Sequence, residues 1–273
     1  MPDVRIRKLD GLAECEGLLE IQRRAWGHED LDLTPVHQFI IHSRMGAILL
    51  GAFVDGALVG YVYSFPAVHG GRFCQHSHHL AVLPGYQGFG LGKKLKWAQR
   101  REALKQGIDL ITWTYDPMQA RNANLNLHKL GVRSRTYLGN FYGFTPSLCL
   151  GPEIPTDRLL VEWPIKAGRV RDRLGRKRGR REAGGLPKAL ERAAECGDPF
   201  PPPGEPRLRL KDRVLLAEIP PDIKALQTRP DLIAGWQAAL RAVLTGYFKR
   251  GWVADDFLFA DRAFYILRKD GKG

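Results

Sequence analysis

The segment GYQGFGLGKKL, residues 85–95, restricts the fold of this chain more than any other stretch. Four glycines, at positions 85, 88, 90 and 92, lie within eight residues. Glycine disfavours regular structure, but it allows positive φ angles and lets a ligand approach the backbone closely. The preceding LAVLP is typical of a strand, and residues 91–106 have the periodicity of a helix stopped by Gly107. We therefore predict a glycine-rich turn from a strand into a helix.

A turn of this kind is suited to phosphate, because the first amides of a helix lack intrahelical partners and lie at the positive end of its dipole. A flexible hairpin or a simple helix cap would need one glycine, not four. The Walker pattern fails at Gln87 and Lys94, where it needs Gly and Ser or Thr. The dinucleotide pattern starting at Gly88 fails at Lys93.

The first 150 residues alternate between strand-like and helix-like periodicity. Asp55-Gly56 between two apolar runs indicates a hairpin. The predicted elements are a strand at 4–7, helices at 15–26 and 35–43, the hairpin at 47–65, strands at 74–84 and 108–115, helices at 91–106 and 120–131, and a strand at 135–144.

The hexapeptide pattern Gln-x-x-Gly-x-Gly, at Gln87, Gly90 and Gly92, resembles the coenzyme A signature of the GNAT superfamily of acyl-CoA N-acyltransferases. The order of predicted elements from about residue 4 to 144, half of the chain, also resembles the GNAT fold. The resemblance implies an α/β (α+β) protein with a mixed, mostly antiparallel sheet flanked by helices. It implies a splay between the fourth and fifth strands, and this chain adds a C-terminal strand–helix–strand extension.

The same resemblance implies that acetyl-CoA or another acyl-CoA is the co-substrate. Amides of the turn would hold its pyrophosphate, and the backbone of the strand before the turn would bind its pantetheine arm. Many relatives place a tyrosine acid where this chain has Leu127, which makes Tyr142 and Tyr137 the nearest substitutes. The implied cofactor-binding residues are Leu80, Ala81, Val82, Gln87, Gly88, Phe89, Gly90, Leu91, Gly92, Lys93, Asn122 and Asn124.

Acyl transfer to an amine requires the neutral amine, so a base that titrates near neutrality is useful. The segment HSHH supplies three histidines just before the turn. Strand alternation predicts His76 and His78 on one face and His79 on the other. We predict His78 as the base and His76 as second choice; edge histidines satisfied by hydrogen bonds are the alternative. No metal is predicted, because the His-x-His pair lacks a third ligand at suitable spacing.

The acceptor contacts predicted are Trp26, Arg121 and Arg158, with Asp157 beside the last. Arg158 would suit a carboxylate through bidentate pairing, although a solvated surface arginine is the alternative. Longer bacterial GNAT-like proteins that share the HSH…LAVLP strand and an NFYG segment resemble this layout. Some of them are N-succinyltransferases of amino acids, which adds succinyl-CoA as a donor and an amino acid as an acceptor. A protein or peptide amine is a further alternative.

Residues 1–150 are predicted as the catalytic domain and 151–165 as a strand and connector. Residues 166–205 are predicted as a basic, proline-rich mobile linker, and 206–273 as an α/β extension packed on the catalytic domain. Within the extension, residues 213–220 read as a strand and 231–250 as an amphipathic helix. Residues 255–269 read as two strands with a turn near Asp261.

The net charge of +13 raises a nucleic-acid-binding alternative, centred on residues 166–181. That run holds nine Lys or Arg and one Asp, a net charge of +8. It lacks the interleaved aromatics that single-strand binding favours, so we interpret it as a solvated loop.

The four scattered cysteines (15, 74, 149 and 196) predict reduced thiols. The start shows no signal-peptide pattern, and no apolar run is long enough to span a membrane, so a cytoplasmic protein is expected. Neither a membrane nor a nucleic acid is expected as a partner, and a homodimer stays open.

Overall fold

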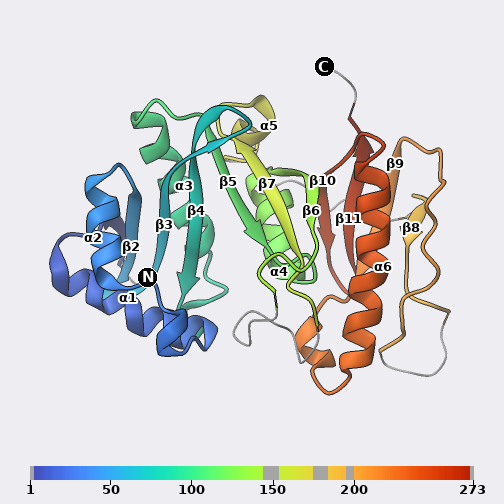
Figure 1. Ribbon diagram of the computed structural model, residues 1–273, viewed down its shortest axis with the longest axis horizontal. Coiled ribbons are helices and arrows are strands. Elements are labelled where there is room, and N and C mark those ends of the chain that lie inside the picture. The colour runs from blue at the N-terminus through green and yellow to red at the C-terminus, as the bar shows by residue number, and fades with distance from the viewer. Residues whose placement is uncertain (1–2, 144–153, 175–183, 195–199, 271–273) are drawn as a thin grey trace. The chain divides into compact units, whose positions relative to one another are not determined.

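The computed structural model describes residues 3–143, 154–174, 184–194 and 200–270, which form two compact units (Figure 1). The first unit comprises Met1–Trp113 and Pro164–Lys166, and the second comprises Thr114–Trp163 and Ala167–Gly273. The domain boundaries predicted at residues 150, 165 and 205 stay a prediction.

The first unit is built on strands in the order β1-β2-β3-β4-β5, antiparallel except for the parallel pair β4 and β5. The predicted hairpin turn between β2 and β3 is confirmed: Asp55 and Gly56 have φ angles of 49° and 85°, the pair of positive values that a type I′ turn needs. The strands are β1 (Val4–Lys8), β2 (Ile48–Val54), β3 (Ala57–His69), β4 (Arg72–Val82) and β5 (Leu110–Tyr115), whose last two residues belong to the second unit.

Helices cover both faces of these strands (Figure 1). On one face, α1 (Gly11–Trp26) and α2 (Val36–Arg44) bury an apolar cluster that includes Leu18, Phe39 and Tyr61. Burying one such side chain contributes about 1.5–3 kcal/mol. On the other face, α3 (Leu91–Lys105) packs its polar residue Gln99 against Ser77 of β4. Short 3₁₀ turns occupy Asp30–Asp32 and Pro84–Tyr86.

The predicted splay between the fourth and fifth strands is confirmed. Within the first unit, β4 and β5 pair at two positions, Gln75 with Ile111 and His76 with Thr112. The remainder of β4 stays paired with β3 on its other side, up to Val82 opposite Gly60. The edge of β4 that faces away from β3 therefore parts from β5 just after His76.

The second unit has strands in the order β7-β6-β10-β11-β9-β8. The predicted helix over 231–250 is confirmed as α6 (Pro230–Phe248), whose buried stripe includes Trp236, Leu240 and Tyr247. The strands are β6 (Arg133–Leu138), β7 (Arg158–Pro164), β8 (Lys188–Leu190), β9 (Val214–Ile219), β10 (Trp252–Phe259) and β11 (Ala263–Lys269). The other helical segments are α4 (Ala120–Ala123), the π-helix η3 (Asn124–Leu130), α5 (Gly168–Arg171) and the 3₁₀ turn η4 (Ile223–Leu226).

Two local predictions are wrong. The strand predicted over 135–144 ends at Leu138, because the chain turns at Asn140, which has a φ angle of 44°. The segment 166–205, predicted as a mobile linker, contains the helix α5 with Val170 fully buried. Residues 188–190 within the predicted linker form β8, which pairs in parallel with β9. Residues 144 and 175–183 lie outside the described residues.

The described residues contain no helix both long and apolar enough to cross a bilayer. In that part of the chain, no group of three or more His, Cys, Asp or Glu side chains is arranged to hold a metal ion. Cys15 and Cys74 are buried free thiols. Cys149 and Cys196 lie outside the described residues.

Candidate active site

The glycine-rich turn follows β4 directly and leads into α3. Gly88 and Gly90 adopt φ angles of 87° and 78°, which only glycine adopts without strain. Gly90 is the N-cap of α3. A Cβ added at Gly85, Gly88 or Gly90 would meet no atom within 4 Å, so the space over the turn is open.

The first amides of α3 have no acceptor within the helix. Lys94 N donates to Gly90 O at 3.0 Å and closes the first helical hydrogen bond, which leaves the preceding amides of the turn without an intrahelical acceptor. The first turn carries Lys93 and Lys94 and no acidic residue. Cations are unfavourable at a helix N-terminus, whereas an anion bound there would offset both the dipole and the two lysines.

The side chain of Gln87 ties the turn to the end of β4, because its Nε2 donates to Val82 O at 3.0 Å. The Val82 carbonyl is therefore engaged within the protein. Phe89 at the tip of the turn is 75% exposed. Leu80 and Val82 are half-buried on the part of β4 that has separated from β5, and Ala81 between them is buried.

A β-bulge in β4 places the histidines differently from the prediction. Tyr63 pairs with His79 and the next residue of β3, Ser64, pairs with Ser77, so His78 is the extra residue. The rings of His78 and His79 stack with centroids 4.3 Å apart, and both contact the ring of Tyr63. The expectation that His79 lies on the opposite face from His78 is therefore wrong, because one inserted residue cancels the alternation.

The three histidines have different environments. His78 is exposed, yet packing around its ring lowers its pKa through desolvation and, to a lesser extent, through His42. His76 lies next to Thr112 Oγ1 at 3.1 Å, and burial followed by the charges of His78 and Lys96 lowers its pKa to about 4. His79 is buried against Tyr61 Oη at 2.9 Å, and burial holds its pKa well below its ordinary value.

Trp26, at the end of α1, contacts this histidine cluster, and its role as an acceptor contact stays a prediction. Its ring lies edge-on to His79, with centroids 4.9 Å apart, and it also contacts the rings of Tyr61 and His28. Within the first unit, Trp26 is thus linked to His78 through the ring of His79.

Sequence reasoning missed Lys96, which is fully buried in α3. Its Nζ hydrogen bonds with Ser77 Oγ at 3.0 Å and Gln99 Oε1 at 2.7 Å, and it lies 3.7 Å from the centroid of Trp113. Burial lowers the pKa of Lys96 well below its ordinary value. The signal available in the sequence was its position between two large apolar residues of the predicted helix, Leu95 and Trp97.

The remaining predicted site residues belong to the second unit. Asn122 and Arg121 are exposed on α4, and Asn124 begins the π-helix. Tyr142 Oη lies 3.2 Å from Thr114 Oγ1. Arg158 is only 8% exposed: it donates to Asp157 O at 2.8 Å and lies over the ring of Tyr142, so the surface-arginine alternative is wrong.

Comparison with known proteins agrees with this geometry. Residues 15–132 match the model of the acetyltransferase (GNAT) family. They form a GNAT acetyltransferase domain. The match assigns this domain to the acetyltransferases and does not define its acceptor. A search of the curated proteins finds no match.

Solved structures support the GNAT fold. YncA of Salmonella typhimurium, a proposed acetyltransferase solved with its cofactor acetyl-CoA, shares 21% identity with a TM-score of 0.51, covering 60% of this chain and 95% of that one. A proposed acetyltransferase from Acinetobacter baylyi ADP1 shares 16% identity with a TM-score of 0.51, covering 62% and 95%. Such low identities show the fold alone.

The two tyrosines predicted as candidates for the catalytic acid, Tyr137 and Tyr142, have different surroundings. Tyr137 Oη donates to Asp157 Oδ2 at 2.6 Å, and burial together with that carboxylate raises the pKa of Tyr137. Its proton is held within the protein. Leu127, at the position where many relatives carry tyrosine, is fully buried. Tyr142, 42% exposed, stays the predicted acid.

Proposed function

We propose that this chain transfers an acyl group from acetyl-CoA or succinyl-CoA directly to the amine of a small molecule or an amino acid. The turn at Gly88 and Gly90 is the observation that carries the proposal. It combines positive φ angles, open space, amides without helical acceptors and two lysines in the first turn of α3. That combination fits the diphosphate of an acyl-CoA.

The residues present fit such a co-substrate. Main-chain amides of residues 87–93 would hold the diphosphate, and the separated edge of β4 at residues 80–82 would take the extended arm. Asn122 and Asn124 are the further contacts that we propose. An acyl-CoA bound there would supply the activated carbonyl.

On the acceptor side, His78 is the residue that we propose to take a proton from the amine. It is exposed, and its neutral form is favoured by its surroundings. His76 stays neutral at pH 7 but is a weaker base, since its pKa is about 4. Trp26 would border the acceptor beside them. The two arginines predicted for an acceptor carboxylate differ in exposure, since Arg121 is exposed and Arg158 is buried.

A peptide or protein amine remains the alternative acceptor. A nucleic-acid partner receives less support, because Arg169 and Arg173 of the basic run lie near Asp255 and Asp256 in partly or fully buried ion pairs. These two guanidinium groups are not available to a polyanion.

Titration of acetyl-CoA, succinyl-CoA and duplex DNA, followed by calorimetry and thermal melting, tests the proposal. A co-substrate at a hundred times its Kd stabilises a fold by about 2.7 kcal/mol. Gly90→Asp places a carboxylate in the cradle and should abolish acyl-CoA binding. Gly107→Asp is the matched control, because Gly107 at the other end of α3 has a φ angle of 76° and the same open space.

Equal loss in both variants, or full binding by Gly90→Asp, would remove the turn from the proposal. Stabilisation by DNA alone would favour the nucleic-acid alternative. Amino acids and other small amines, each tested with both donors for release of free thiol, then identify the acceptor.

A further inference from the structure

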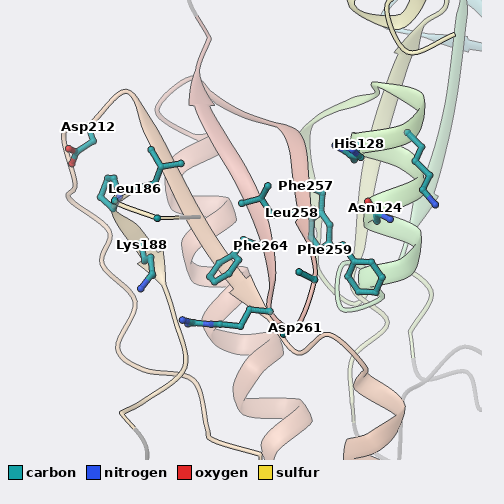
Figure 2. A pocket seen from close by; sticks show the side chains of 16 residues that line it. Asn124, His128, Leu186, Lys188, Asp212, Phe257, Leu258, Phe259, Asp261 and Phe264 are labelled. Atoms are coloured by element: carbon teal, nitrogen blue, oxygen red, sulfur yellow. The ribbon is translucent and has the colours of Figure 1, made fainter. Parts of the chain in front are cut away.

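The second unit contains a pocket of about 1050 Å³ that is separate from the glycine turn (Figure 2). Its walls come from the π-helix η3, the end of β10, the turn into β11 and residues 184–188. The pocket opens on the face of the strands away from α6 (Figure 2). A space of this size is sufficient for a small organic ligand.

Apolar side chains form one part of the wall. Phe257 and Phe264 are buried, whereas Leu186, Leu258 and Phe259 are half-exposed, so their surfaces remain available to a ligand. The rings of Phe257 and Phe259 lie with centroids 6.5 Å apart. The half-exposed ring of Phe259 can therefore meet a flat apolar ligand face-on or edge-on.

A histidine that is fixed by a hydrogen bond, His128, forms another part of the pocket wall. His128 Nδ1 lies 2.9 Å from Asp256 Oδ1, and Asp256, 3% exposed, also pairs with Arg173 at 3.2 Å. Burial raises the pKa of Asp256, but the hydrogen bond from His128 and the charge of Arg173 outweigh burial and hold it below its ordinary value. Asp256 is therefore a carboxylate at neutral pH, and it accepts the Nδ1 proton of His128.

This arrangement fixes the histidine in one orientation. Arg173 Nη1 also lies 3.4 Å from His128 Nδ1, and a guanidinium can only donate a hydrogen bond. If Nδ1 accepted that hydrogen bond, its lone pair would face the Asp256 carboxylate, which is closer, at 2.9 Å. Nδ1 therefore carries hydrogen and Nε2 is left for a ligand. With Nδ1 directed at Asp256, a ligand carboxylate at Nε2 requires the doubly protonated imidazole, and Asp256 does not neutralise that charge because it already pairs with Arg173.

From this geometry we propose that the pocket binds a small aromatic acid, with its ring against Leu258 and Phe259 and its carboxylate at His128. Lys129, exposed beside His128, adds positive charge at the same end. The two acidic lining residues, Asp212 and Asp261, lie across the pocket from His128 (Figure 2). The site is independent of the acyl-CoA cradle, since no residue of the turn at 85–93 lines it.

Calorimetric titration of the full chain with indole-3-acetate and with the uncharged indole-3-acetamide tests the proposal. We expect the acid to bind about tenfold more tightly than the amide, the difference expected of one charge-assisted hydrogen bond. Leu258→Glu should weaken the acid at least about tenfold by placing a like charge in the apolar wall. Leu208→Glu, the same change at an exposed leucine outside the pocket lining, should leave the affinity unchanged.

His128→Gln separates recognition of the carboxylate from packing of the ring. It should reduce the affinity for the acid to that of the amide and leave the amide unaffected, with melting curves confirming that the variant is folded. Leu258→Glu, at a half-exposed position, provides an independent variant if His128→Gln does not fold.

Three results would overturn the proposal. One is the absence of binding by either indole compound at concentrations up to about 5 mM, beyond which so small a ligand binds with no useful efficiency. Another is equal affinity for acid and amide. The third is displacement of the acid by saturating coenzyme A, which would locate the acid in the donor site.

Discussion

The Nζ atom of Lys96 lies 3.7 Å from the centroid of the Trp113 ring, with its hydrogen bonds made to Ser77 and Gln99. Lysine is rarely fully buried, because taking an ammonium ion out of water is costly. Burial lowers the pKa of Lys96 well below its ordinary value.

Lys96→Met should therefore stabilise the protein at pH 7 by about 1 kcal/mol or more. Gln99 Nε2 already donates to Ser77 Oγ at 3.0 Å, so these two side chains keep a partner. The gain should shrink as pH rises toward 10.5, because the unfolded parent then loses the proton that its folded state binds weakly. Urea unfolding at pH 7 and 9.5 measures this; Lys105→Met, at an exposed lysine, is the control. An unchanged or lower stability at pH 7 would contradict the argument.

Because His78 lies in the bulge of β4 and outside the glycine-rich turn, its substitution should impair catalysis without weakening the binding of coenzyme A. With the amine and donor identified by the screen, His78→Gln should lower kcat by about 10²-fold or more and leave the Kd of coenzyme A unchanged. The acidic limb of the parent should lie below pH 6.5, because the pKa of His78 is lowered, and it should vanish in the variant. His37→Gln, at an exposed histidine of α2, is the control. A retained acidic limb would assign the base elsewhere.

Stability should fall as pH is lowered through the range from 6.5 to about 4. In this window the unfolded state protonates His76 and the folded state does not, since burial lowers the pKa of His76 to about 4. The full difference corresponds to roughly 3 kcal/mol. His76→Gln should flatten this part of the curve of unfolding free energy against pH. An identical pH slope in parent and variant would show that His76 titrates normally.

The two tyrosines should separate chemistry from folding. Tyr142→Phe should lower kcat about tenfold or more and leave stability within about 0.5 kcal/mol. Tyr137→Phe removes a donor from the buried carboxylate of Asp157 and should destabilise the second unit by about 1–3 kcal/mol without altering kcat. Paired measurements of kcat and urea midpoint decide between them, and the opposite assignment of effects would exchange their roles.

Much of the first unit could be predicted because its signals are local. The Asp55-Gly56 turn, the glycines before α3 and the apolar stripe of α6 each specify structure within a few neighbouring residues. The bulge at His78 could not be predicted in this way. It depends on how β4 pairs with β3, and one inserted residue moves every following side chain to the other face.

Buried charges were the second type of failure. Lys96, Arg158 and Arg169 looked like solvated surface residues, because lysine and arginine are rarely buried. Their partners lie far along the chain: Arg169, for example, hydrogen bonds with Asp255 O, 86 residues away. A pattern read within one segment contains no information about such a partner. The sequence analysis named Trp26 as an acceptor contact, whereas the contacts of its ring with Tyr61 and His79 required the fold.

The burial of Arg169 and Arg173 changes how this protein should respond to ionic strength. Of the nine basic residues between 166 and 181, these two already neutralise aspartates of β10, so they cannot release counterions from a polyanion. Retention on a heparin column should therefore be weaker than the local net charge of +8 at residues 166–181 implies, and adding salt should elute the protein early.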